Sequence, residues 1–141
     1  MKRLIIIVLA LSVAAVVLLG WSMFGDRSSF QTGLKQYENL PNTASDITIY
    51  QNRNISGTFV ADFKIYEPDF ILFARKKGCE VQAISSPTYV CQAKAFQEGK
   101  PNDRKEVTNG LFYSQRAANG GEISLTYDRG SGRAYIESSS R

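Results

Sequence analysis

Residues 57–78 read GTFVADFKIYEPDFILFARKKG, and they contain the clearest change from strand to helix in the chain. In the first half, apolar side chains occupy every second position, at Phe59, Ala61, Phe63 and Ile65. This period of two is typical of a strand with one buried face. We therefore predict a strand over 57–66, with Asp62 on its solvent face.

The second half of the same stretch predicts a helix over 67–78. Pro68 suits the first turn, where its missing N–H is not needed, and Asp69 suits the positive end of the helix dipole. Gly78 follows a basic run and can take the left-handed conformation that ends many helices. We expect the apolar side of this helix to pack on the strand before it.

Period-two stretches on either side of this pair predict a mainly antiparallel sheet. One precedes it, at 46–50, and five follow it, at 79–84, 89–96, 107–116, 122–128 and 133–138. The element order is ββαβββββ with short strand connections, which predicts an α+β domain with a curled sheet packed on one helix. We expect 79–84 and 89–96 to form a hairpin and 97–106 to be a loop.

The last two strands allow a prediction of register. A turn centred on Gly130 and Ser131 sets two apolar pairs facing the core, Tyr127 with Ala134 and Leu125 with Ile136. The other face of these strands is then a solvent face. The register of 107–116 stays open, because one residue more or less in the following turn decides which side chains face the core. The two choices are Leu111 with Tyr113 or Phe112 with Ser114.

The N-terminus predicts a membrane segment. Residues 4–24 carry no charge, and 21 residues in a helix span about 31 Å, the thickness of the hydrocarbon core of a bilayer. Lys2 and Arg3 precede the segment, which predicts a cytoplasmic N-terminus and a periplasmic or extracellular C-terminal part. The lipid bilayer is thus the first expected partner.

These boundaries predict three parts: a signal-anchor transmembrane helix over 1–24, a tether over 25–45, and an extracytoplasmic domain over 46–141. The alternative is secretion after cleavage near Ser22, because the stretch 20–22 has the small-x-small pattern of a cleavage site. The length of the apolar segment favours the retained anchor.

The two cysteines, Cys79 and Cys91, both lie in the part predicted to be outside the cytoplasm. An oxidising compartment favours a disulfide between them. Closing a loop of 11 intervening residues would stabilise a small domain by roughly 2 to 3 kcal/mol on the chain-entropy model. We therefore predict a Cys79–Cys91 disulfide.

The composition argues against several chemistries. The chain has no histidine, which removes the usual general base and the commonest zinc ligand. The net charge of +4 includes Lys2 and Arg3, so the remainder carries only +2, and we expect no nucleic-acid partner. No sequence pattern indicates a catalytic residue, a metal ligand or a cofactor site. A carboxylate-dependent hydrolase acting on an envelope polymer remains an alternative, but nothing singles out a pair of carboxylates.

The C-terminal strands carry tyrosine and arginine, the residue types enriched at binding hot spots. The candidates for a partner-binding face are Tyr113, Arg116, Arg133 and Tyr135, and the last two are expected to be the most exposed. An ordinary solvated sheet face is the competing interpretation. We predict a noncatalytic membrane-tethered binding module, such as an inhibitor, an immunity protein or an accessory subunit, which contacts a protein outside the cytoplasm. A structural spacer is the further alternative.

Overall fold

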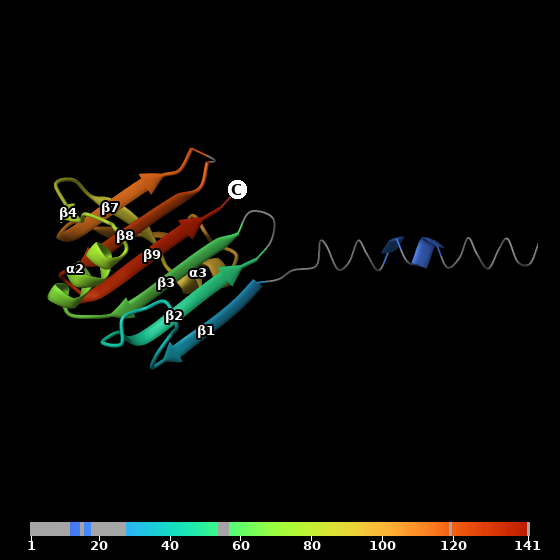
Figure 1. The fold of residues 1–141 in the computed structure, drawn as a ribbon, viewed down its shortest axis with the longest axis horizontal. Coiled ribbons are helices and arrows are strands. Elements are labelled where there is room, and N and C mark those ends of the chain that lie inside the picture. The colour runs from blue at the N-terminus through green and yellow to red at the C-terminus, as the bar shows by residue number, and fades with distance from the viewer. Residues whose placement is uncertain (1–11, 15, 18–27, 54–56, 119, 141) are drawn as a thin grey trace, which may run out of the picture.

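The computed structural model describes residues 12–14, 16–17, 28–53, 57–118 and 120–140. Within them the chain forms a small domain built mainly of one antiparallel sheet with few helices, which confirms the general class predicted (Figure 1). Most of the predicted membrane helix over 4–24 lies outside the described residues, which include only 12–14 and 16–17 of it. Among those residues, no helix is both long enough and apolar enough to cross a bilayer.

The sheet has seven strands in the order β1-β2-β3-β9-β8-β7-β4. Their bounds are β1 Ser28–Leu34, β2 Ser45–Asn52, β3 Thr58–Lys64, β4 Gln82–Ala83, β7 Gly110–Arg116, β8 Glu122–Asp128 and β9 Arg133–Ser139. Two further strands, β5 Thr88–Cys91 and β6 Arg104–Val107, form a separate hairpin. The helices are α2 Glu67–Lys76 and α3 Ala93–Gln97.

The strand and helix at 57–78 form as predicted and lie at the centre of the fold. The strand β3 pairs with β2 on one side and with β9 on the other. Helix α2 then folds back onto the same sheet, where the ring of Phe70 stacks on Tyr127 with centroids 5.3 Å apart. The ring of Phe73 meets Phe63 edge-on at 6.5 Å. Gly78 follows the helix at φ 74°, the left-handed conformation expected of it.

The predicted register of β8 and β9 is correct, with Tyr127 opposite Ala134 and Leu125 opposite Ile136. The open choice for β7 is also decided, because Leu111 and Tyr113 pair with Tyr127 and Leu125 and so share the α2 face. Gly110 starts this strand so close to β8 that a Cβ there would lie 1.7 Å from the Tyr127 carbonyl oxygen.

The predicted solvent face of the sheet is wrong, because a second layer covers it. The β5–β6 hairpin and α3 pack on the side opposite α2, around Val60 and Tyr135. Segment 79–96 therefore does not make the predicted hairpin. Instead, β4 pairs with β7 at the sheet edge, and β5 pairs with β6, which forms from residues expected to be a loop. Asp62, placed in solvent by the alternation, is only 7% exposed.

The predicted tether over 25–45 is wrong from Ser28 onward. Ser28–Leu34 forms the edge strand β1, which pairs along β2 with a bulge between Gln31 and Leu34. The chain then crosses the α2 face, where Leu40 and Ala44 are buried. The folded domain thus begins only three residues after the apolar segment ends at Phe24.

The predicted disulfide is not formed, and both cysteines are free and buried. Cys79 lies in the cluster beneath α2, whereas Cys91 lies in the cluster formed with α3 on the other side of the sheet. The two thiols are thus separated by the sheet, so a bond between them would require a different fold.

Candidate functional site

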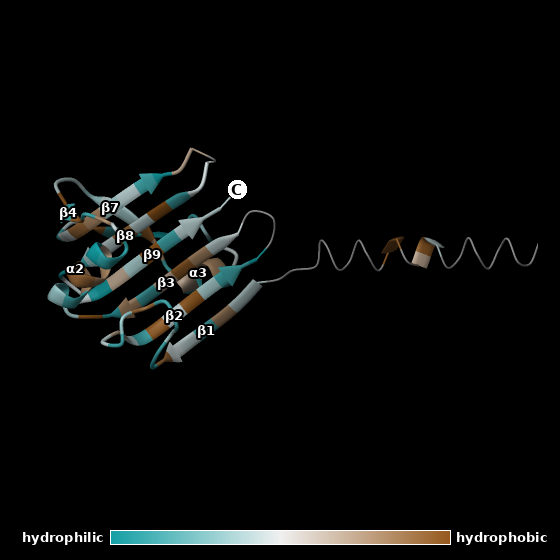
Figure 2. Ribbon diagram, in the orientation of Figure 1, coloured by the Kyte–Doolittle hydropathy of each residue, from teal (hydrophilic) through white to brown (hydrophobic). Residues whose placement is uncertain are grey.

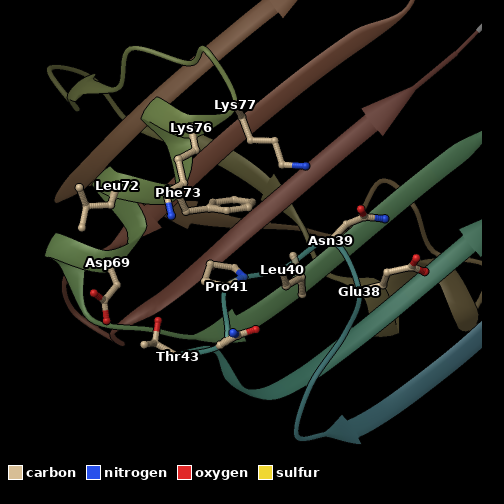
Figure 3. Close-up of a pocket in the computed structure, with 11 residues that line it drawn as sticks. Glu38, Asn39, Leu40, Pro41, Thr43, Asp69, Leu72, Phe73, Lys76 and Lys77 are labelled. Carbon is tan, nitrogen blue, oxygen red and sulfur yellow. The ribbon is translucent and has the colours of Figure 1, made fainter.

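The α2 face of the sheet is only partly covered, and a groove lies beside the helix. Figure 3 shows α2 on one side and the chain from Glu38 to Thr43 on the other. We call this the helix–loop groove; it encloses about 600 Å³. Its lining comprises residues 38–43 with Asp69, Leu72, Phe73, Lys76 and Lys77.

A second hollow, the sheet groove, continues over the strands and encloses about 420 Å³. It shares Asn39, Leu40, Phe73 and Lys77 with the helix–loop groove, so the two adjoin. Its other lining residues are Tyr37, Gln51, Phe59, Ile123, Leu125, Ile136 and Ser138. Most of these side chains are apolar, and the polar ones among them are Gln51, Ser138 and the hydroxyl of Tyr37.

The sheet register explains why the groove lies where it does. Three rows of side chains cross the α2 face, and each row joins residues paired on neighbouring strands. The helix row is Phe63, Ala134, Tyr127 and Leu111; the middle row is Ile49, Ala61, Ile136 and Leu125; the end row is Gln51, Phe59, Ser138 and Ile123.

Burial decreases along these rows in the direction away from α2. The residues named in the helix row and the middle row are buried, with side chains no more than 8% exposed. Tyr113, which continues the middle row on β7 by pairing with Leu125, is only partly buried. All four residues named in the end row are only partly buried. Helix α2 is short and lies over the end of the sheet opposite to the start of β1. It therefore does not reach this row (Figures 1 and 2). The apolar side chains of Phe59 and Ile123 are therefore left accessible within a hollow.

Charged groups stand at the groove but not at its floor. The ammonium of Lys77 lies 5.7 Å from the centre of the Phe73 ring and extends over the sheet (Figure 3). Lys76 and Asp69 line the helix side, and Glu38 lies on the facing chain. Figure 3 places the two carboxylates at opposite ends of the groove. They do not converge on one point, as a pair acting on one bond would.

The predicted partner-binding face does not exist as a surface. Tyr135 is only 3% exposed, because the β5–β6 hairpin covers it. Tyr113 lies on the opposite, α2 face, and its hydroxyl donates to Gln115 Oε1 at 2.6 Å. Arg116 is exposed at the end of β7, directly across from Glu122. The four predicted residues thus lie in three different places.

Arg133 has a structural role within the covered face. Its guanidinium donates to Asp46 Oδ2 at 2.6 Å and to Asp62 Oδ1 at 2.5 Å. Asp62 Oδ2 in turn accepts the N–H of Ala93 at 3.2 Å, which holds the start of α3 against β3. The hydrogen bonds and charge of Arg133 keep the pKa of Asp46 below its ordinary value.

A second ion pair ties the β5–β6 hairpin to the sheet. The Lys105 ammonium lies 2.7 Å from Asp128 Oδ2 and 2.9 Å from the hydroxyl of Tyr135. Burial opposes the charge on Lys105, but the hydrogen bonds to Asp128 and Tyr135 outweigh it and raise the pKa of the lysine. Lys105, Asp128 and the Tyr135 hydroxyl are thus bonded to one another across the contact between the hairpin and the sheet.

The two thiols are poor nucleophiles. Burial raises the pKa of Cys79, and burial together with the neighbouring Glu137 raises the pKa of Cys91 to about 12. Both are therefore protonated near neutral pH. Among the described residues, no three cysteine or carboxylate side chains lie close enough to hold a metal ion.

The groove was not predicted, because residues 37–43, which form part of its wall, lie in the stretch predicted to be a tether. Tyr37 and Leu40 pack on the sheet, and the Tyr37 ring stacks on Phe59 with centroids 6.2 Å apart. The signal was present: Leu34, Tyr37 and Leu40 recur every three residues in an otherwise polar stretch. Such spacing indicates contact with a core rather than a free linker.

No protein-family model matches this chain, and neither a curated protein nor a solved structure matches it. What the groove can bind is therefore inferred from the residues that line it.

Proposed function

We propose that this chain is a noncatalytic binding module, held at the outer face of a membrane by its N-terminal segment, and that it binds its ligand in the groove beside α2. The observation that carries the proposal is the end row, where Phe59 and Ile123 are left accessible in a hollow of about 420 Å³. Ligand sites commonly enclose about 300 to 1,000 Å³, with an apolar lining and a few polar groups that orient the ligand.

The polar groups of the sheet groove suit an amphiphilic ligand. Lys77, Asn39, Gln51 and Ser138 line the groove together with the apolar side chains, and Lys77 carries the only charge among the described residues that line it. A ligand with an apolar body and an anionic or polar end would satisfy both parts. The body would displace water from the floor, at roughly 25 cal/mol for each Å² of apolar surface buried.

The hydrolase alternative has less support. Glu38 and Asp69 line the helix–loop groove from opposite ends, and Leu40 and Pro41 lie between them (Figure 3). General acid and base catalysis on one glycosidic bond requires two carboxyl groups within about 10 Å that face the same bond. The groove therefore fits binding better than hydrolysis.

A photoreactive residue at the rim tests whether the groove is occupied. Benzoylphenylalanine would replace Asn39, which lines both parts of the groove, in the full chain produced in membrane-containing cells. We expect irradiation to give a covalent adduct whose mass identifies its partner. Ile123→Glu, which puts a charge on the groove floor, should remove the adduct. Tyr66→Glu, at an 80% exposed site beside the far end of α2, should leave it unchanged.

The same residue placed at Ser86, in an exposed turn outside the groove, gives the background. An adduct at position 39 that survives Ile123→Glu, or no adduct at all, would contradict the proposal and favour the structural spacer. Thermal unfolding of each variant checks that the fold is intact. If Ile123→Glu does not fold, Ser138→Trp replaces it, because the indole fills the groove without introducing a charge.

A further inference from the structure

We infer that the ligand of the sheet groove is an anionic phospholipid of the membrane to which the chain is anchored, with an acyl chain on the groove floor and its phosphate near Lys77. This inference rests on the proposed function and names the ligand of the same site. Three independent features support it: the length of chain before β1, the position of the groove in the sheet, and the charges beside it.

The first feature is the short connection to the apolar segment. Only Gly25, Asp26 and Arg27 separate Phe24 from Ser28, the first residue of β1. A fully extended chain over that interval spans at most about 14 Å. If residues 4–24 lie in the bilayer, the start of β1 is therefore held close to the headgroups.

The second feature is that the groove opens at that same end of the sheet. Because the strands are antiparallel, Ser28 lies beside Asn52, and the row of paired residues continues through Thr58 and Ser139 to Glu122. We call this the Ser28 end. The end row of the groove lies one residue further in on each strand, at Gln51, Phe59, Ser138 and Ile123. Helix α2 covers the opposite end of this face (Figure 1), so the partly buried apolar side chains of the end row lie toward the Ser28 end.

The third feature is positive charge beside the sheet groove, from Lys77 and Arg53. Arg53 follows β2, and its guanidinium donates to the groove residue Gln51 at 3.4 Å. Neither Arg53 nor Lys77 takes part in a salt bridge among the described residues, whereas Asp46, Glu67 and Asp128 are all paired at the far end. Unpaired cations beside an apolar floor match a phosphate attached to acyl chains.

Photoreactive lipids test this inference. The full chain would be reconstituted in phosphatidylcholine nanodiscs that contain phosphatidylglycerol with a diazirine near the end of one acyl chain, or the same label on phosphatidylcholine. We expect labelled peptides of two kinds, those from residues 4–24 and those containing Phe59 or Ile123. Labelling of the second kind should be several-fold stronger with phosphatidylglycerol.

Charge variants separate lipid recognition from mere proximity. Lys77→Glu and Arg53→Glu should remove the preference for phosphatidylglycerol in the groove, with residues 4–24 labelled as before. Arg75→Glu, which changes the same charge at the same helix end but lies outside both grooves, is the matched control. A flexible insertion between Arg27 and Ser28 should lower labelling of the groove, because it releases the Ser28 end from the bilayer.

Labels confined to residues 4–24, or equal groove labelling by both lipids in all variants, would overturn the inference. A different outcome would be that position 39 cross-links to another protein in a groove-dependent way while no lipid labels the groove. That outcome would overturn the lipid inference but would leave the proposed binding module supported. Absence of both adducts would remove both proposals.

Discussion

At the scale of single residues, the clearest energetic feature is the pair between Lys105 and Asp128. Burial alone would raise the pKa of Asp128, but hydrogen bonds from Lys105, Ser131 and the N–H of Gly130 outweigh it, and the pKa is lowered. A carboxyl group whose pKa is lower in the folded state contributes stability above its unfolded pKa, and that contribution is lost as pH falls.

We therefore expect the free energy of unfolding to fall as pH drops below about 4, the ordinary value for an aspartate. Asp128→Asn should lower stability by about 2 kcal/mol at neutral pH, because Lys105 loses its charged partner, and should flatten the acid dependence. Urea unfolding between neutral and acidic pH measures both effects. Asp103→Asn, at an exposed loop position, is the control, and an equally flattened curve there would contradict the assignment.

Residue-level reasoning from sequence succeeded where the period of two was long and uninterrupted. The register of β8 and β9 follows from the turn at Gly130 and from the apolar pairs on one face. The same reasoning failed for Tyr135 and Asp62, because alternation shows that a strand has two faces but not what covers the second one. Here the second face is covered by the β5–β6 hairpin, which packs on β9, and by α3, which packs on β1, β2 and β3.

At the scale of elements, the three rows of the α2 face differ in burial. Phe63 in the helix row is fully buried beneath α2, whereas Phe59 in the end row is only partly buried and lines the sheet groove. A residue that is accessible in a hollow contributes less to folding and more to contact with a ligand. The rows therefore allow stability and binding to be separated by mutation.

We expect Phe63→Ala to cost about 3 to 5 kcal/mol of stability, the usual cost of removing a buried phenylalanine. Phe59→Ala should cost about 1 kcal/mol, because its ring is only partly withdrawn from water, yet it should abolish occupancy of the groove. Denaturant unfolding gives the first quantity, and cross-linking from position 39 gives the second. Equal costs for the two substitutions would show that the end row is ordinary core.

Short elements were predicted least well. The predicted strand over 79–84 contains β4, but β4 has only two residues and pairs with β7, and the five-residue helix α3 was not predicted because it is too short for a periodic pattern to appear. Helix α3 occupies residues that alternate as a strand would, since Ala93 and Ala95 point into the core while Lys94 does not. The edge strand β1 is polar apart from Phe30 and Leu34, so its composition resembles that of a linker.

At the scale of the whole molecule, the sheet separates two hydrophobic clusters, and one cysteine lies in each of them. Each thiol lies in a different cluster, and both are buried. A molecule with a disulfide between these positions would have to bring opposite faces of the sheet together. The location of the thiols is therefore a test of the architecture as a whole.

We expect a maleimide reagent to modify neither cysteine rapidly in the folded protein near neutral pH and to modify both in urea without prior reduction. Burial limits access, and the raised pKa of each thiol keeps it protonated. Mass spectrometry after labelling counts the modified thiols. A requirement for a reducing agent before the second thiol reacts would indicate the disulfide and contradict the fold.

The place of β9 at the middle of the sheet has a consequence for the order of folding. Strands β1, β2 and β3 are neighbours in sequence and in space, but β3 pairs on its other side with β9, which is synthesised after all the other strands. During synthesis β3 therefore presents an unpaired edge bearing Phe59, Val60 and Phe63. Long-range pairing of this kind closes slowly, and unpaired edges promote aggregation. The nascent chain would thus depend on chaperones or on delayed collapse until its last strand arrives.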